Sequence, residues 1–137
     1  MLKEGAIDKT GKLKTQNAPM TQNDIRRIQT AKAAIRAGMD ALLKRARLAL
    51  KDLSALYVAG KFGNFIDKHA AMQMGLLPDM DSRKIKFIGN AAYKGAVMAL
   101  CSLDAMKKSK EIANQAVHVS LFGLKDFKEE FIKHMRF

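Results

Sequence analysis

Cysteine and tryptophan are almost absent from this chain of 137 residues, which has one cysteine and no tryptophan. A single thiol cannot form an internal disulfide, and it cannot alone hold a structural zinc ion or an iron–sulfur cluster. Cys101 lies among Ala99, Leu100 and Leu103, and we interpret it as a buried structural thiol. We therefore expect neither a disulfide framework nor an iron–sulfur cluster in this chain.

Long hydrophobic runs are lacking as well. No run approaches the ~20 apolar residues that a membrane-spanning helix requires. The segment from Met1 to Gly5 lacks the apolar core of a secretory signal. Together with the single cysteine, these absences predict a cytoplasmic protein that has no membrane partner.

Motifs for catalysis and metal binding are missing too. The sequence has no serine-centred nucleophile elbow and no His-x-x-x-His pair. Its histidines lie far apart, which predicts no metal site: His69, His118 and His134. Asp79 and Asp81 follow Pro78 closely, and we assign them to a turn in preference to a metal site. A complete enzyme is therefore the least favoured class of function.

Negative charge is scarce relative to positive charge. The sequence has 25 Lys and Arg against 13 Asp and Glu, which gives a formal net charge of +12. Such a surface attracts polyanions without sequence preference. No aromatic-rich or recognition motif accompanies the charge, so nucleic acid is not the favoured partner. An acidic protein partner and a plain solvated surface are the other interpretations.

The chain is long enough for one domain, and its 48% hydrophobic residues suffice for a packed core. We expect residues 1–20 to form an irregular segment, because glycine, asparagine and proline interrupt any period. Thr21 is the expected N-cap of a long helix from Gln22 to Ala46. The apolar positions of this helix recur at steps of three and four: Ile25, Ile28, Ile35, Met39, Leu42 and Ala46. Gly38 in mid-helix indicates close packing on a neighbour.

Two strand–glycine–helix units follow in tandem. The first strand runs from Ala55 to Ala59 and enters a loop with Gly60 and Gly63, and the second runs from Ile85 to Ile88 and enters Gly89. We expect the helix after the second strand to run from about Ala91 to Met106. A short strand over Val117–Leu121 and a final amphipathic helix complete the order. This alternation predicts an α/β fold with parallel strand pairs, and three short strands indicate part of a larger sheet.

The glycine turns are the best functional candidates. Glycine permits positive φ and leaves no Cβ to block a ligand, so a strand–glycine–helix turn brings backbone close to a phosphate or sugar. Gly60-Lys61-Phe62-Gly63 matches neither the P-loop nor the Gly-x-Gly-x-x-Gly pattern. Spacing alone therefore leaves two interpretations open, a ligand loop or an ordinary tight connection.

Several segments closely resemble the C-terminal part of the ATP-dependent reductive activators of corrinoid proteins. They follow the same order as in that family and cover nearly the whole chain: Thr21–Arg26, Gln29, Ala31–Ile35, Ala37–Gly38, Tyr57–Phe65, Gly75–Pro78, Phe87–Ala92 and Gly95–Ala96. The family belongs to the actin, sugar-kinase and heat-shock-chaperone ATPase superfamily. Its members use ATP to help drive a low-potential electron onto Co(II) of a corrinoid protein.

The resemblance implies an α/β fold equivalent to part of an actin-like (ribonuclease H-like) ATPase lobe, with a short, mostly parallel sheet and flanking helices. Residues 21–137 would be the C-terminal half-lobe. The strand–glycine turn would bind adenosine, the long helix would approach the nucleoside from the other side, and the second glycine turn would pack at the hinge between lobes. The implied nucleotide site comprises Gly60, Lys61, Phe62, Gly63, Asn64, Gln29, Lys32, Arg36, Gly89 and Asn90.

Two departures from the family qualify what the resemblance implies. Lys61 stands where the family usually has a second glycine, and its side chain could clash with adenosine or pair with phosphate. The family's phosphate-binding hairpins, catalytic acidic residue and iron–sulfur domain lie N-terminal to the matched region. We therefore expect no catalytic residue and no activity from this chain alone.

The favoured hypothesis is that the chain contributes the adenosine side of an ATP site, with Mg, in a corrinoid activator. It would need an N-terminal complement or self-association, and a corrinoid protein would be a further partner. The chain would then be a fragment, a split gene product or a degenerate copy. The alternative is a basic, non-catalytic interaction module with a vestigial nucleotide loop, which binds an acidic protein or nucleic acid.

Overall fold

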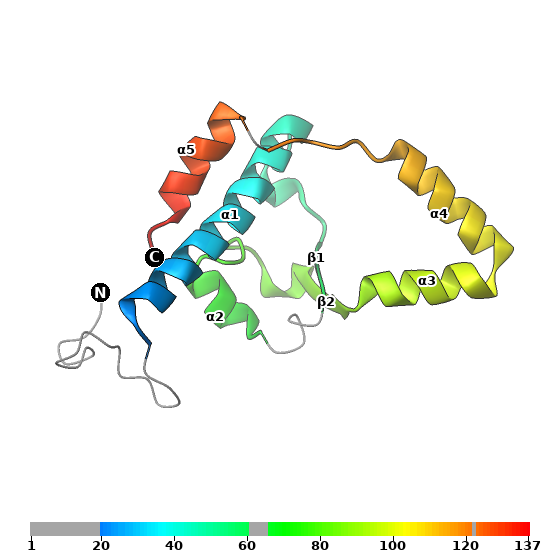
Figure 1. Cartoon of the computed structure of the whole chain (residues 1–137), viewed down its shortest axis with the longest axis horizontal. Coiled ribbons are helices and arrows are strands. Elements are labelled where there is room, and N and C mark those ends of the chain that lie inside the picture. Colours follow the sequence, from blue (N-terminus) through cyan, green and yellow to red (C-terminus); the bar gives the residue numbers. More distant parts are fainter. Residues whose placement is uncertain (1–19, 61–65, 122) are drawn as a thin grey trace.

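The computed structural model describes residues 20–60, 66–121 and 123–137. Within these ranges a long helix precedes two strands that are joined through a short helix, and three more helices follow. Short 3₁₀ turns at Leu50–Asp52 and Ser82–Lys84 precede the strands. The expected α/β class with parallel pairing is confirmed. Two helices form an arm that extends away from the rest of the molecule (Figure 1).

Helix α1 (Gln22–Ala46) has the bounds that the sequence predicts. Its N-cap is Thr21, whose hydroxyl accepts a hydrogen bond from the Asp24 N–H at 3.2 Å, while Asp24 Oδ2 accepts one from the Thr21 N–H at 3.0 Å. These reciprocal bonds satisfy N–H groups that have no partner inside the helix. The helix ends at Arg47, which adopts a left-handed conformation with φ of 56°.

The buried face of α1 consists largely of small residues. Its buried apolar members all lack long side chains: Ala33, Ala37, Gly38 and Ala41. Helix α5 (Lys125–His134) packs along α1, which Figure 1 shows as two neighbouring coils. A Cβ on Gly38 would lie 3.4 Å from Leu121 Cδ1, so the expected close packing at this glycine is confirmed.

The apolar stripe expected for α1 is wrong at three positions, because Ile35, Leu42 and Ala46 are exposed. Ile35 is 47% exposed and Leu42 is 49% exposed. Because the last part of the chain packs on the small-residue face, the larger aliphatic side chains point away from that contact. They stay partly open to solvent in the described part of the chain.

Strands β1 (Leu56–Ala59) and β2 (Ile85–Gly89) form a parallel pair. Leu56 lies opposite Ile85, and the register shifts by one residue just before Gly89. The connection between the strands includes α2 (Lys68–Gln73), as a parallel pair requires.

The apolar core lies between this connection and the sheet. Ile85 is fully buried, and Ala71 and Leu77 are almost so. Partly buried side chains surround them: Leu56, Val58, Ile66, Met72, Leu76 and Met80. Gly75 terminates the turn after α2 with φ of 77°, a left-handed conformation that glycine adopts without strain.

The arm consists of α3 (Ala91–Cys101) and α4 (Leu103–Gln115). The expected continuous helix to Met106 is wrong, because Ser102 adopts extended angles and accepts a hydrogen bond from the Ala105 N–H. Serine caps a new helix better than it continues one. Cys101 is exposed at this break, so its predicted burial is also wrong.

The predicted strand over Val117–Leu121 is not a strand in the structure. This segment is irregular and leads back from α4 toward α1 (Figure 1). An alternating pattern becomes a strand only when a partner supplies hydrogen bonds, and no described residue makes a backbone hydrogen bond to residues 117–120. No helix in the described ranges combines the length and apolarity needed to cross a membrane.

Replacement of Ile85 by alanine should destabilise the fold strongly, because the side chain is fully buried in the small core. We expect the free energy of unfolding to fall by about 2–5 kcal/mol. The matched control is Ile112→Ala, since Ile112 is 60% exposed, and it should change stability by less than about 0.5 kcal/mol. Urea unfolding followed by circular dichroism measures both variants, and equal losses would contradict the assigned core.

Candidate functional site

The two glycine turns meet at the carboxyl end of the sheet. Gly60 has φ of 105° and Gly89 has φ of 65°, and the Gly60 N–H donates a hydrogen bond to the Gly89 carbonyl at 2.7 Å. These φ values are strained for any residue with a Cβ, so glycine is required for conformation at both positions. The structure thus places side by side two turns that are 29 positions apart in the sequence.

Asn90 continues the second turn and caps α3. Its side-chain oxygen accepts a hydrogen bond from the Tyr93 N–H at 3.0 Å, and the Lys94 ammonium donates to the Ile88 carbonyl at 3.1 Å. The remaining members of the predicted adenosine loop lie outside the described residues: Lys61, Phe62, Gly63 and Asn64.

No described residue crowds the backbone of Gly60. A Cβ placed on it would meet no other heavy atom within 4 Å among the described residues. The described residues therefore leave the backbone of Gly60 accessible to a ligand. This arrangement fits the close backbone approach that a nucleotide needs.

Lys32 of α1 is buried and holds the C-terminal residues. Its ammonium group donates a hydrogen bond to the Arg136 carbonyl and lies 4.8 Å from the centre of the Phe137 ring. A Cβ on Gly75 would lie 3.2 Å from the same nitrogen. Burial, followed by the nearby Arg36, lowers the pKa of Lys32. In this structure Lys32 is engaged with the C-terminal residues.

The other two predicted helix residues lie on the same side of α1 as Lys32. Gln29 is half-buried, and the Arg36 side chain is 14% exposed and lies 3.9 Å from Asp40. The buried Nε of Arg36 has no hydrogen-bond partner among the described residues. Within those ranges no hydrogen bond or ion pair connects the three helix residues to the glycine turns.

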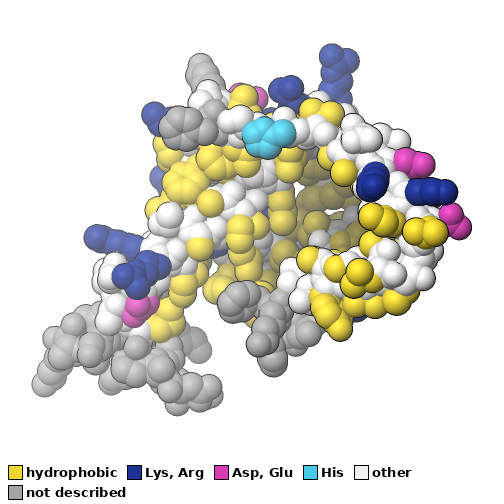
Figure 2. Space-filling view, turned by 45° about the vertical axis from the view of Figure 1, so that its right-hand side comes forward, with side chains coloured by type: hydrophobic (Ala, Val, Ile, Leu, Met, Phe, Trp, Pro, Cys, Tyr) yellow, Lys and Arg dark blue, Asp and Glu magenta, His cyan; other side chains and the backbone are white. Residues whose placement is uncertain are grey.

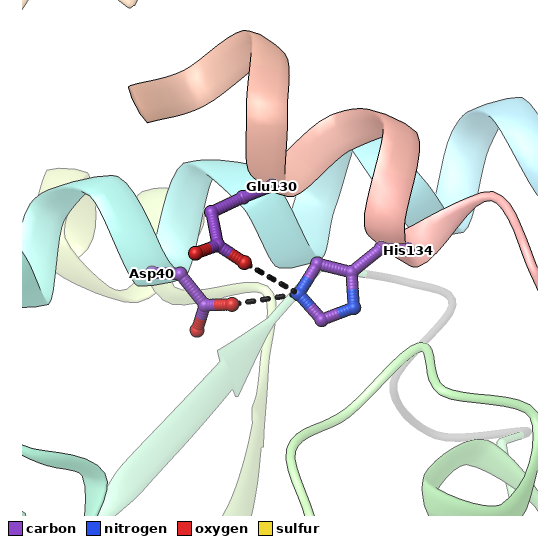
Figure 3. Close-up of side chains that lie close together, drawn as sticks. All are labelled: Asp40, Glu130 and His134. Carbon is purple, nitrogen blue, oxygen red and sulfur yellow. Dashed lines mark hydrogen bonds and ion pairs between the residues drawn. The ribbon is translucent and has the colours of Figure 1, made fainter. Parts of the chain in front are cut away.

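A cluster that sequence reasoning missed joins α1 to α5. His134 Nε2 lies 2.6 Å from Asp40 Oδ2 and 3.8 Å from Glu130 Oε2, and the three groups converge in Figure 3. Their nearest ligand atoms all lie within 4.8 Å of one another, which is close enough to hold a metal ion. The available signal was the i, i+4 spacing of Glu130 and His134, which puts both on one helical face. Nothing in the sequence linked that face to Asp40.

Neighbouring cations already neutralise both carboxylates of this cluster. Lys44 lies 3.0 Å and Lys133 3.2 Å from opposite oxygens of Glu130, while Arg36 lies 3.9 Å from Asp40. Three cations against two carboxylates disfavour an added divalent ion by electrostatic repulsion. The cluster of Asp40, Glu130 and His134, together with Lys44, therefore links helices α1 and α5 by ion pairs and hydrogen bonds, and we call it the ionic clasp.

Three comparisons with known proteins agree. Residues 2–137 match the family described as the C-terminal domain of RACo, the ASKHA domain. The corrinoid activation enzyme RamQ of Eubacterium limosum is 35% identical over 118 residues, or 86% of this chain. A solved reductive activator for corrinoid, iron–sulfur protein shares 30% identity and a TM-score of 0.82 over 96% of the chain. The chain spans 20% of RamQ and 25% of that solved chain.

Neutralising Glu130 should remove a stabilisation that depends on pH. The hydrogen bond from Lys44, with help from Lys133, lowers the pKa of Glu130 below its ordinary value of 4.5. A carboxyl group whose pKa is lower in the folded state than in the unfolded state stabilises the fold when it is ionised. This contribution is fully present at pH values above the unfolded-state pKa, and it is lost as the pH falls through the folded-state pKa. Near neutral pH, the free energy of unfolding of the wild type should therefore exceed that of Glu130→Gln by about 0.2–1 kcal/mol.

The difference should disappear as the pH falls below 4.5 toward the lowered pKa of Glu130. Thermal unfolding at a series of pH values measures it. Glu129→Gln serves as control, since Glu129 is exposed on the same helix and makes no ion pair in the described part of the chain. A wild-type advantage that persists at low pH would contradict the clasp.

Proposed function

The chain belongs to the family of the C-terminal ASKHA domain of RACo, and on that premise we propose that it contributes the adenosine side of an ATP site in a reductive activator of corrinoid proteins. The expected family is thereby confirmed. We propose further that the chain binds the adenosine part of the nucleotide, and the observation that supports this is the contact between the two glycine turns. Gly60 and Gly89 lie side by side at the carboxyl end of the two strands, and no described residue crowds Gly60.

The proposed site takes ATP with Mg. Gly60 and Gly89 would admit the nucleotide to the backbone, and Asn90 would hold the second turn in place by capping α3. Bound ATP would supply the free energy of its hydrolysis to electron transfer in the assembled activator. Gln29, Lys32 and Arg36 remain predicted contacts from α1; of these, Lys32 would have to leave the Arg136 carbonyl to reach a ligand.

The proposed site is completed by the part of an activator that precedes the matched region. The chain spans only a fifth to a quarter of the two relatives, which are themselves an activation enzyme and a reductive activator. We therefore assign the phosphate side and the electron-transfer centre to an N-terminal complement, meaning the polypeptide of an activator that precedes the matched region. A corrinoid protein would be the partner of the assembled pair. By itself the chain is not expected to turn over ATP.

Isothermal titration with MgATP tests the site. We expect little binding by the chain alone and clear binding when it is co-purified with the N-terminal complement. Gly89→Ala should weaken that binding about tenfold, because a side chain at its φ of 65° adds strain of about 1–3 kcal/mol. Gly95→Ala is the control, since Gly95 lies in helix α3 and a Cβ there meets nothing within 4 Å. Absence of binding in both preparations would refute the proposal.

The alternative is the basic interaction module, which the net charge of +12 favours. Its binding to an acidic protein or to nucleic acid would weaken steeply with salt and would not respond to ATP. Fluorescence anisotropy with a labelled acidic peptide and a labelled oligonucleotide, at low and moderate salt and with or without MgATP, separates this function from the nucleotide site.

A further inference from the structure

The arm of α3 and α4 contains no buried residue. Each of these helices packs extensively only with the other among the described elements. Large apolar side chains cover it, including Leu100 at 86%, Leu103 at 77% and Met98 at 62% exposure. Apolar surface of this extent is favourable to remove from water, at roughly 25 cal/mol per Å². The arm therefore presents an exposed apolar surface on which another polypeptide segment could pack.

The segment Val117–Ser120 is the second exposed element. Its backbone makes no hydrogen bond within the described ranges, although Ala116 before it and Leu121 after it are both bonded. Val117 is 79% exposed. Its alternating sequence has a strand pattern without a strand partner, which is the condition for adding a strand from another chain.

The arm, the segment and the sheet together surround a hollow. Figure 1 shows α3, α4 and the segment forming three sides of a ring that the sheet and α1 close. Figure 2 shows hydrophobic side chains gathered around and within this hollow. A parallel pair of strands normally has both faces and both edges covered, and the described residues leave this pair without a second covering layer on the side of the ring.

The solved activator has the additional polypeptide from which an occupant could come. The chain superposes on it over 96% of its length, which includes the open arm, yet represents 25% of that protein. The same arrangement thus exists where much more polypeptide is present. A second copy of this chain is disfavoured as the occupant, because two molecules of net charge +12 repel each other.

We propose that the ring is a docking surface for the N-terminal complement, which adds one strand along Val117–Ser120 and fills the hollow with apolar side chains. This inference rests on the proposed function only for the identity of the complement. The added strand provides main-chain hydrogen bonds, and the apolar face of the arm supplies burial. Docking would complete the fold before any nucleotide binds.

A proline scan over residues 117–120 of the full chain, co-expressed with the N-terminal complement of the solved activator, tests the proposal. Successive N–H groups in a strand point to opposite edges, so proline should block docking at alternate positions only. We expect about a tenfold weaker complex at either 117 and 119 or 118 and 120, as lost main-chain hydrogen bonds would cause. The remaining pair serves as the internal control.

Complex formation is measured without nucleotide by light scattering after gel filtration, with hydrogen exchange at residues 117–120. Slower exchange in the complex and alternating sensitivity support the proposal. Uniform sensitivity, no sensitivity, or formation of a homodimer through the same residues would overturn it. A complex that forms but binds no ATP would refute the proposed nucleotide site and leave the docking surface intact, so the two failures are distinguishable.

Discussion

Most of the architecture depends on how closely α5 can approach α1. The alanine and glycine face of α1 lets the final helix lie directly on it, and Leu121 contacts Gly38 where the chain enters that contact. The Asp40–His134 pair and the Lys32 bond to Arg136 then fix the contact along its length. Because these pairs join residues 94 and 104 positions apart, they close the chain and return the far end of the arm to the body of the molecule.

Local sequence patterns correctly predicted the helices and strands whose ends are set by interactions within a few residues. Thr21 and the periodicity after it gave the bounds of α1, and the strand–glycine units gave both strands, because caps, turns and core-facing periods act over a few residues. Predictions failed where the outcome depends on distant chain. Val117–Leu121 needs a strand partner that the described residues lack, and Cys101 has apolar neighbours that nothing in those ranges covers.

The same division applies to the candidate site. Gly60 and Gly89 were identifiable from the sequence because a positive φ favours glycine over other residue types. Parallel strands then bring both turns to the same end of the sheet, where the strands terminate. The Asp40–Glu130–His134 cluster was not, since no local pattern connects helices so far apart in sequence. Lys32 was identified in the sequence as a candidate contact to the nucleotide, but its contacts were not predicted. In the structure it contacts Arg136 and Phe137, which lie more than a hundred positions later in the chain.

The position of Lys32 also has a consequence for the time order of folding. A buried ammonium group without a partner is costly, and its partner carbonyl is 104 residues later. During synthesis the ribosome releases α1 well before Arg136, so water solvates the Lys32 ammonium until the C-terminal residues arrive to cover it. Contacts of such long sequence separation close late and slowly. The small-residue face of α1 thus stays uncovered on the nascent chain until the residues around Arg136 have been made, and during that interval a chaperone or a partner has access to it.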